Sequence, residues 1–262
     1  MTASTPLRTR VRPVPPPGSR RPAPPALVLV AHGSRDPRAL TTVRALEARV
    51  RALRPGLPVR LGHIELNEPL LPDTLAALGD TRAVLVPLLL GRGYHVKQDI
   101  PELAAQAPVR ASVAAPLGPH PLLAEALHAR LTESGWPATL DGAARRTTAV
   151  VLAAAGSRDP DSATDIRRTA RLLAGRLGVP VVPAYASAAT PTVPTALRAL
   201  AAGGRHRVAV ASCFTAPGRF ATQCASQAPW IASAPLGAHE TMARLVLHRY
   251  DQSLSTGWAE AA

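Results

Sequence analysis

Hydrophobic residues near the start of the chain form first a continuous run and then a repeat with the spacing of a helix. Residues Ala26–Ala31 form a continuous apolar run just before Gly33, which is typical of a strand buried in a parallel sheet. Beyond Gly33, apolar side chains recur at the spacing of an amphipathic helix: Leu40, Val43, Leu46, Val50 and Leu53. Asp36 and Pro37 predict the start of this helix, as N-cap and first helical residue, and Pro55-Gly56 predicts its end.

The same alternation continues through the first half of the chain. Further strands are expected at Val59–Glu65, Ala83–Leu90 and Val109–Ala115, and further helices at Leu70–Leu78, Ile100–Gln106 and Leu122–Leu131. Gly91–Tyr94 is expected to open a loop after the third strand. Strands that alternate with helices predict parallel βαβ units with right-handed crossovers.

This pattern occurs twice. VLVAHGSRDP at 28–37 recurs as VLAAAGSRDP at 151–160, and APLGPH at 115–120 recurs as APLGAH at 234–239. Between them, Val59–Leu78 aligns with Val181–Leu200. Three matched stretches in the same order, at a nearly constant offset, indicate an internal duplication. We therefore predict an α/β protein of two tandem doubly wound parallel-sheet domains. The expected organisation is a Pro/Arg-rich disordered tail at 1–26, a first domain at 27–135, a linker at 136–146 and a second domain at 147–262.

Composition narrows the class of protein. The 262 residues are 47% hydrophobic and 18% charged, and no apolar run is long enough to cross a membrane. No secretory signal precedes the first strand, and two cysteines cannot build a disulfide framework. A cytoplasmic protein without a membrane partner is expected. The net charge of +13 lies partly in the tail, and aromatic residues make up only 3%, so we expect no nucleic-acid partner.

Candidate functional residues follow the first strand, because ligands of such folds bind at the carboxyl ends of the strands. His32 would project from the strand tip. Gly33 permits a tight turn, and Ser34 and Arg35 lie at a helix N-terminus, which is a natural anion site.

Two further strand ends carry polar side chains. Glu65 ends the second strand, and His95 stands in the loop after the third strand, between Arg92 and Lys97. Loops on a rigid scaffold often carry function.

The duplication acts as an internal control. Ala155 stands opposite His32, Ser187 stands opposite Glu65, and the loop Thr215–Phe220 has no histidine. The turn residues recur while these three side chains do not, which predicts one chemical site in the first half. Two imidazoles and a carboxylate suit a divalent first-row metal such as Co²⁺, Fe²⁺, Ni²⁺ or Zn²⁺, with positions left open for substrate.

Other histidines and the cysteines are assigned to the scaffold. His120 and His239 recur in both halves, which favours a structural place such as a helix start. Cys213 and Cys224 have no equivalents in the first half and are interpreted as buried thiols.

These motifs together resemble the sirohydrochlorin chelatase (CbiX/SirB-like) family of class II chelatases, in its long two-domain form. The matching residues are Val30–Asp36, Glu65, Gly93-Tyr94-His95, Asp99-Ile100-Pro101 and Pro116–His120. The resemblance implies ATP-independent insertion of Co²⁺ or Fe²⁺ into sirohydrochlorin, in cobalamin or sirohaem synthesis. His32 and His95 match the catalytic histidines, and Glu65 joins them as metal ligand.

The substrate suggests roles for the cations. Sirohydrochlorin carries many carboxylates, so Arg35, Arg92, Lys97 and the turn at Gly33 and Ser34 are expected to bind it. The metal is a substrate, and no tightly bound cofactor is expected. A tandem repeat can close its own cleft, which makes a monomer plausible.

Two alternatives stay open at this point. A non-catalytic metal or tetrapyrrole carrier would use the same ligands without inserting the metal. A histidine-dependent phosphatase is the other, because His32-Gly33 resembles the Arg-His-Gly turn of such enzymes, although Ala31 stands where they have arginine.

Overall fold

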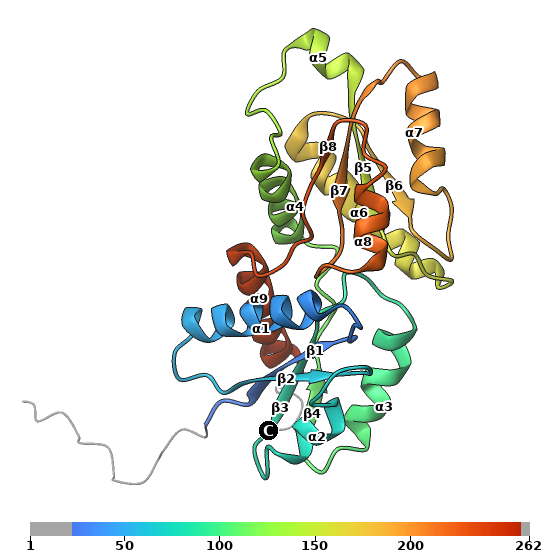
Figure 1. The fold of residues 1–262 in the computed structure, drawn as a ribbon. Helices are drawn as coiled ribbons and strands as arrows, with labels where there is room; N and C mark the ends of the chain where they lie inside the picture. Colours follow the sequence, from blue (N-terminus) through green and yellow to red (C-terminus); the bar gives the residue numbers. More distant parts are fainter. Residues whose placement is uncertain (1–22, 258–262) are drawn as a thin grey trace, which may run out of the picture.

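Two parallel four-stranded sheets form the protein in the computed structural model, which describes residues 23–257 (Figure 1). The first sheet has the order β2-β1-β3-β4, and its strands are β1 (Ala26–Ala31), β2 (Val59–His63), β3 (Ala83–Pro87) and β4 (Ala111–Val113). The second has the order β6-β5-β7-β8, from β5 (Thr148–Ala154), β6 (Val181–Tyr185), β7 (Arg207–Ser212) and β8 (Ile231–Ala232). The predicted duplicated α/β fold is confirmed. Most of the predicted tail lies outside the described residues.

Helices connect the strands in both halves. The first half contains α1 (Pro37–Leu53), α2 (Leu71–Ala76), α3 (Ile100–Ala105) and α4 (Pro121–Glu133). The second contains α6 (Pro160–Leu177), α7 (Val193–Ala202), α8 (Arg219–Ala225) and α9 (Glu240–Gly257). Among residues 23–257, no helix combines the length and apolarity needed to cross a bilayer.

Some element bounds differ from the prediction. The segment between the halves carries a short helix, α5 (Gly142–Thr147). His95 was expected in a loop, but it begins a π-helical turn, η1 (His95–Asp99), that runs directly into α3. The Gly93 carbonyl accepts hydrogen bonds from the N–H groups of Val96 (3.1 Å) and Lys97 (3.0 Å), which winds this segment into a helical turn.

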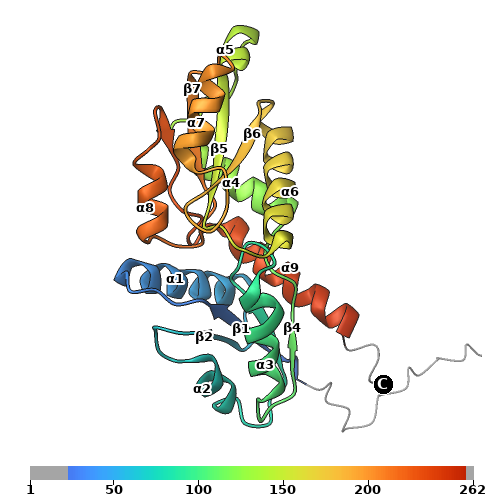
Figure 2. The same ribbon diagram turned by 90° about the vertical axis from the view of Figure 1, so that its right-hand side faces the viewer.

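The last helix of each half packs with the other half. Helix α4 contacts α6 and β7, while α9 contacts α1, β3 and β4 (Figures 1 and 2). One hydrophobic core therefore includes Leu27 of β1 and Leu152 of β5, together with Leu127 of α4 and Tyr250 of α9. The Tyr250 hydroxyl of α9 also donates a hydrogen bond to the Pro25 carbonyl, 2.7 Å away, just before β1. Two sheets that share a core in this way are held in a defined relative position.

Helix starts confirm the assignments made from the repeat. Asp36 Oδ1 accepts from the N–H of Arg38 at 3.0 Å, and its counterpart Asp159 accepts from Asp161 at 2.9 Å. His120 Nδ1 accepts from the N–H of Leu122 at 3.1 Å, so this histidine is the N-cap of α4. Cys213 and Cys224 are free and buried, as predicted.

The His120 cap makes stability depend on pH. Burial, followed by the charges of Arg249 and His248, lowers the pKa of His120 from 6.5 to about 4. The unfolded chain therefore binds a proton that the folded chain rejects, and the stability present above the unfolded pKa is lost as pH falls from 6.5 towards 4. We expect His120→Asn, which keeps a capping acceptor but does not titrate, to reduce this loss. Urea unfolding across this pH range tests it; an equal decline in both proteins would contradict it.

Candidate active site

A close approach between two backbone segments forms the base of the site. Gly33 follows β1 with φ +105°, and a Cβ atom there would lie 1.8 Å from the carbonyl oxygen of Glu65. The N–H of Glu65 donates to the His32 carbonyl at 3.0 Å, and Ile64 donates to Ala31 at 2.9 Å. Glycine at position 33 thus allows His32 and Glu65 to lie side by side.

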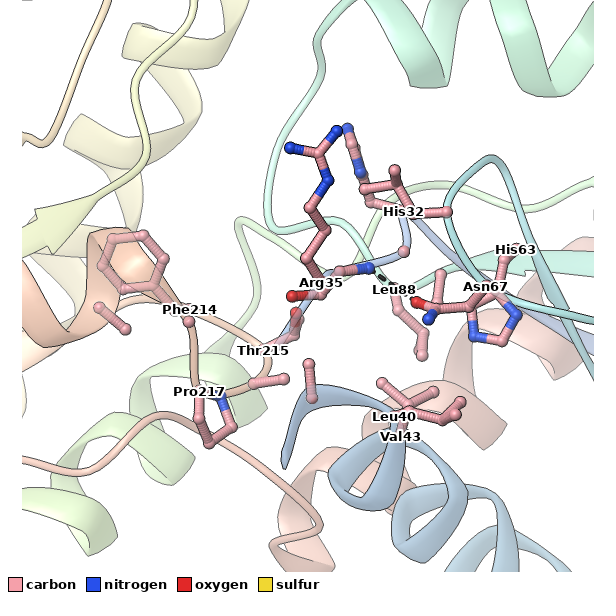
Figure 3. A pocket seen from close by; sticks show the side chains of 18 of the residues that line it. His32, Arg35, Leu40, Val43, His63, Asn67, Leu88, Phe214, Thr215 and Pro217 are labelled. Carbon is pink, nitrogen blue, oxygen red and sulfur yellow. Dashed lines mark hydrogen bonds between the residues drawn. The ribbon is translucent and has the colours of Figure 1, made fainter. Parts of the chain in front are cut away.

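Asn67 completes this turn and was missed by the sequence analysis. Its Oδ1 accepts a hydrogen bond from the Ser34 N–H at 2.7 Å, the dashed line in Figure 3. Ser34 Oγ in turn accepts from the N–H of Asp36 at 3.1 Å, so the N–H groups of Ser34 and Asp36 are engaged within the chain. Ala189 stands opposite Asn67 in the second half, so the comparison of the halves that selected Glu65 could also have selected Asn67.

The structure brings the three predicted metal ligands together. His32 Nδ1 lies 3.5 Å from Glu65 Oε1, and the rings of His32 and His95 meet edge to face with centroids 4.5 Å apart. Within residues 23–257, no three His, Cys, Asp or Glu side chains stand in the arrangement of a ready-made metal cage. The three side chains are neighbours, but their present conformations do not form a closed coordination site.

His95 is oriented by Asp99, a second residue that the sequence analysis left without a role. The His95 Nδ1 atom lies 2.5 Å from Asp99 Oδ2, one turn later in the π-helical segment. A carboxylate at Nδ1 fixes the ring and leaves Nε2 for a metal or a proton, as in many metal-binding histidines. The signal was present in the sequence as a histidine and a carboxylate four residues apart, but it required a helical turn rather than a loop.

The predicted substrate-binding cations differ in their surroundings. Arg35 is exposed at the cavity edge and forms no ion pair with any residue from 23 to 257. Arg92 instead hydrogen-bonds to Asp165 on α6, with Nε 2.9 Å from Oδ2. Lys97 Nζ lies 2.7 Å from Asp159 and 2.9 Å from Asp161. Two of the three cations are therefore paired within the chain.

A cleft between the halves opens beside His32. A cavity of about 510 Å³ is lined on one side by α1 and the Gly33 turn and on the other by residues Phe214–Phe220, which run from a loop into the start of α8 (Figure 3). An adjoining cavity contains His95 and shares His32 and Phe214 with the first. His32 thus lies where the two cavities meet.

The second half repeats the backbone of the site without its side chains. Gly156 has φ +93°, and a Cβ there would lie 1.9 Å from the Ser187 carbonyl oxygen, as Gly33 relates to Glu65. Ala211 of β7 is the counterpart of Val86 of β3. Val86 pairs with Leu29 of β1, and Ala211 pairs with Leu152, the equivalent leucine of β5. Phe220 follows Ala211 by the same number of residues as His95 follows Val86, so Phe220 stands at the position of His95. The strand-end site is therefore present only in the first half.

Comparison with known proteins agrees with these features. A family model described as CbiX matches residues 26–134 and 149–253, once in each half. The chain belongs to the CbiX family. The expectation of that family is confirmed, and the two matches coincide with the two sheets of the duplicated fold.

Relatives of this CbiX protein include two named chelatases. It is 32% identical over 176 residues to "Sirohydrochlorin ferrochelatase" of Bacillus subtilis, and 36% identical over 81 residues to "Sirohydrochlorin cobaltochelatase" of Methanococcus aeolicus. The matches cover 63% and 30% of this chain, and 64% and 57% of those relatives. The chain thus spans less than two thirds of these relatives.

A solved structure shares the fold. "SirB from Bacillus subtilis with Fe3+" superimposes with a TM-score of 0.72 at 24% identity, covering 91% of this chain and 98% of that one. At this identity the likeness concerns the two-domain architecture.

The backbone contact at Gly33 generates a direct test. Gly33→Ala places a methyl group against the Glu65 carbonyl and strains a positive φ, so we expect a loss of ~2 kcal/mol or more in unfolding free energy. Gly56→Ala is the matched control, because Gly56 has φ +84° but no atom within 4 Å of the added carbon. Chemical unfolding of both variants measures the difference; equal losses would show that the close approach contributes nothing.

Proposed function

We propose that this protein inserts Co²⁺ or Fe²⁺ into sirohydrochlorin without ATP, in cobalamin or sirohaem synthesis. The observation that carries the proposal is the meeting of His32, Glu65 and His95 at one cleft of a CbiX-family fold. The names of the relatives supply the substrate. Neither the fold nor these ligand types distinguish cobalt from iron, since imidazole and carboxylate accept both.

The metal is a substrate in this proposal, so it must be bound and then released. His32 and Glu65 are partly exposed at the cleft and separated by 3.5 Å. Small side-chain rotations bring such groups onto a common ion. A site assembled only when the metal arrives holds it less tightly than a closed cage, which favours transfer to the macrocycle.

Two pyrrole N–H protons must leave as the metal enters the macrocycle. His95 is a suitable acceptor because Asp99 occupies its Nδ1 and stabilises the imidazolium that forms when Nε2 takes a proton. His32 adjoins Glu65 in the same way, though at a longer distance. We assign both histidines to metal binding and proton removal.

Arg35 is the side chain that we assign to a substrate carboxylate. It lies at the helix N-terminus after Gly33 and Ser34, and Arg219 of the second half lines the same shallow pocket. Arg38 lines this pocket as well, but it pairs with Asp36. Arg35 and Arg219 at one cavity edge favour a polycarboxylate ligand. The predicted substrate contacts of Arg92 and Lys97 stay a prediction, because both side chains are paired with α6 in this structure.

The second half contributes the apolar wall of the cleft. The protein has two phenylalanines, and both Phe214 and Phe220 line the cavity opposite Leu40 and Val43. Aromatic faces and aliphatic side chains suit a flat macrocycle with charged edges. Phe220 therefore replaces the histidine of the first half with a macrocycle contact.

Assembly and location follow the same proposal. Helix α4 packs against the second half and α9 against the first, so the two halves of one chain are joined and enclose the cleft between them, which supports a monomer. The free thiols of Cys213 and Cys224 suit the reducing cytoplasm.

The central test is His95→Ala. Removing an acid–base group of this kind costs about 10²–10⁴-fold in rate, so we expect cobalt insertion to fall at least ~10²-fold while folding persists. His206→Ala is the control, since His206 is exposed before β7 and does not line either cavity at His32. The absorbance change of metal-free sirohydrochlorin with Co²⁺ measures the rate. Undiminished insertion by His95→Ala would overturn the assignment, and tight binding without turnover by the unaltered protein would indicate a carrier.

Phe220→Ala tests the apolar wall separately. Loss of part of a buried aromatic contact costs about 1.5 kcal/mol, or roughly a tenfold rise in KM for sirohydrochlorin. The KM for Co²⁺ should stay unchanged, because Phe220 lines the first cavity, whereas His95 lines only the adjoining one. Steady-state kinetics with each substrate varied in turn give both constants. A rise in the Co²⁺ constant alone would place Phe220 with the metal instead.

A further inference from the structure

The start of α6 presents three carboxylates to the segment that carries His95. Arg92 and Lys97 flank His95 in the sequence, and Asp159, Asp161 and Asp165 belong to the second half. These five residues, called here the acidic clasp, join the two halves. Lys97 Nζ lies 2.7 Å from Asp159 and 2.9 Å from Asp161, and Arg92 lies 3.5 Å from Asp161.

Asp165 makes the most extensive contact of the clasp. Its side chain is only 1% exposed, and its Oδ2 atom accepts from both the backbone N–H and the Nε of Arg92 at 2.9 Å. Its Oδ1 atom accepts from Arg92 Nη2 at 2.8 Å. Burial by itself would raise the pKa of the Asp165 carboxyl, but the hydrogen bonds and charge of Arg92 lower it overall. The carboxylate is therefore held in its charged form against the backbone of the His95 segment.

The His95 turn has few other anchors. No side chain of η1 is buried, and Tyr94 before it is 67% exposed, so apolar packing contributes little to its position. Gly91 allows the segment to approach α6 closely, because a Cβ there would lie 3.2 Å from the Asp165 Cβ. The core anchors this turn only at its C-terminal end, where Ile100 is fully buried. The charge pairs of Arg92 and Lys97 hold the rest of the turn against α6.

The duplication shows that the clasp accompanies His95. In the first half, Arg38 stands at the position of Asp161 and Thr42 at that of Asp165. In the second half, Pro217 stands at the position of Arg92 and Thr222 at that of Lys97. The equivalent contact on the other side of the cleft therefore lacks both basic members and two of the three carboxylates. The remaining carboxylate, Asp36 at the position of Asp159, pairs with Arg38 of its own half. A device that merely joined the halves would have no reason to be confined to the histidine side.

We propose that the second half acts as a positioning device for the chemistry of the first, with Asp165 as the principal positioning residue for His95. The proposal rests on the metal-insertion function proposed above. Asp165 touches neither metal nor substrate. It acts through Arg92, while Asp159 and Asp161 act through Lys97.

The test compares Asp165→Asn with Asp251→Asn. Asp251 on α9 pairs with Arg54 at the end of α1 at 2.5 and 2.8 Å, so it also joins the halves by a two-point arginine contact, but away from His95. Misplacing a catalytic group costs up to about 10²-fold in rate, so we expect Asp165→Asn to lower kcat by ~10-fold with little change in the KM for sirohydrochlorin. Asp251→Asn should leave kcat unchanged. In a protein that already carries Arg92→Ala, Asp165→Asn should cause little additional fall in kcat, because the two residues act as a unit.

A readout independent of catalysis accompanies the kinetics. Amide hydrogen exchange at residues 93–99 should be faster in Asp165→Asn than in Asp251→Asn, under conditions where both proteins are folded. Unchanged exchange and unchanged kcat in Asp165→Asn, or an equal fall of kcat in Asp251→Asn, would overturn the positioning role. If the unaltered protein inserts no metal but the exchange difference is present, the proposed function fails and the positioning of the His95 turn stands.

Discussion

The close contact between Gly33 and the Glu65 carbonyl is the constraint on which the site depends. A backbone approach of this kind excludes every side chain at position 33, and it brings the ends of β1 and β2 together. His32 and Glu65 become neighbours because the backbone segments that carry them are in direct contact. The hydrogen bond from Ser34 to Asn67 closes the same turn from its other side.

The two halves share the backbone of this turn, but only the first half has the histidines and the glutamate. Gly156 and Ser187 reproduce the backbone contact, and Leu66 and Ala188 share a positive φ after it. The backbone geometry therefore persists without the histidines and the glutamate, so those side chains are not needed for the turn to form. The second half keeps the fold, contributes two phenylalanines to the cleft and pairs its α6 carboxylates with the first half.

Local signals were sufficient for much of the fold and part of the site. Apolar runs predicted the central strands, since buried parallel strands have no polar face, and Asp36-Pro37 predicted the start of α1. Glu65 was selected because its counterpart is serine. Asn67 could have been selected in the same way, since its counterpart is Ala189, but the hydrogen bonds that define the roles of Asn67 and Asp99 form only after the turns fold. The π-helical turn was missed because two glycines nearby resemble a loop.

The sequence by itself determined the duplicated α/β architecture, the half that carries the candidate site and the three side chains that meet there. These features are encoded in short-range periodicity and in the comparison of one half with the other. Only the tertiary structure decided that α4 packs against the second half and α9 against the first, and that Arg92 and Lys97 pair with carboxylates at the start of α6. The physical reason is that such contacts join segments far apart in the chain. Their geometry depends on how two sheets pack, and local pattern does not contain it.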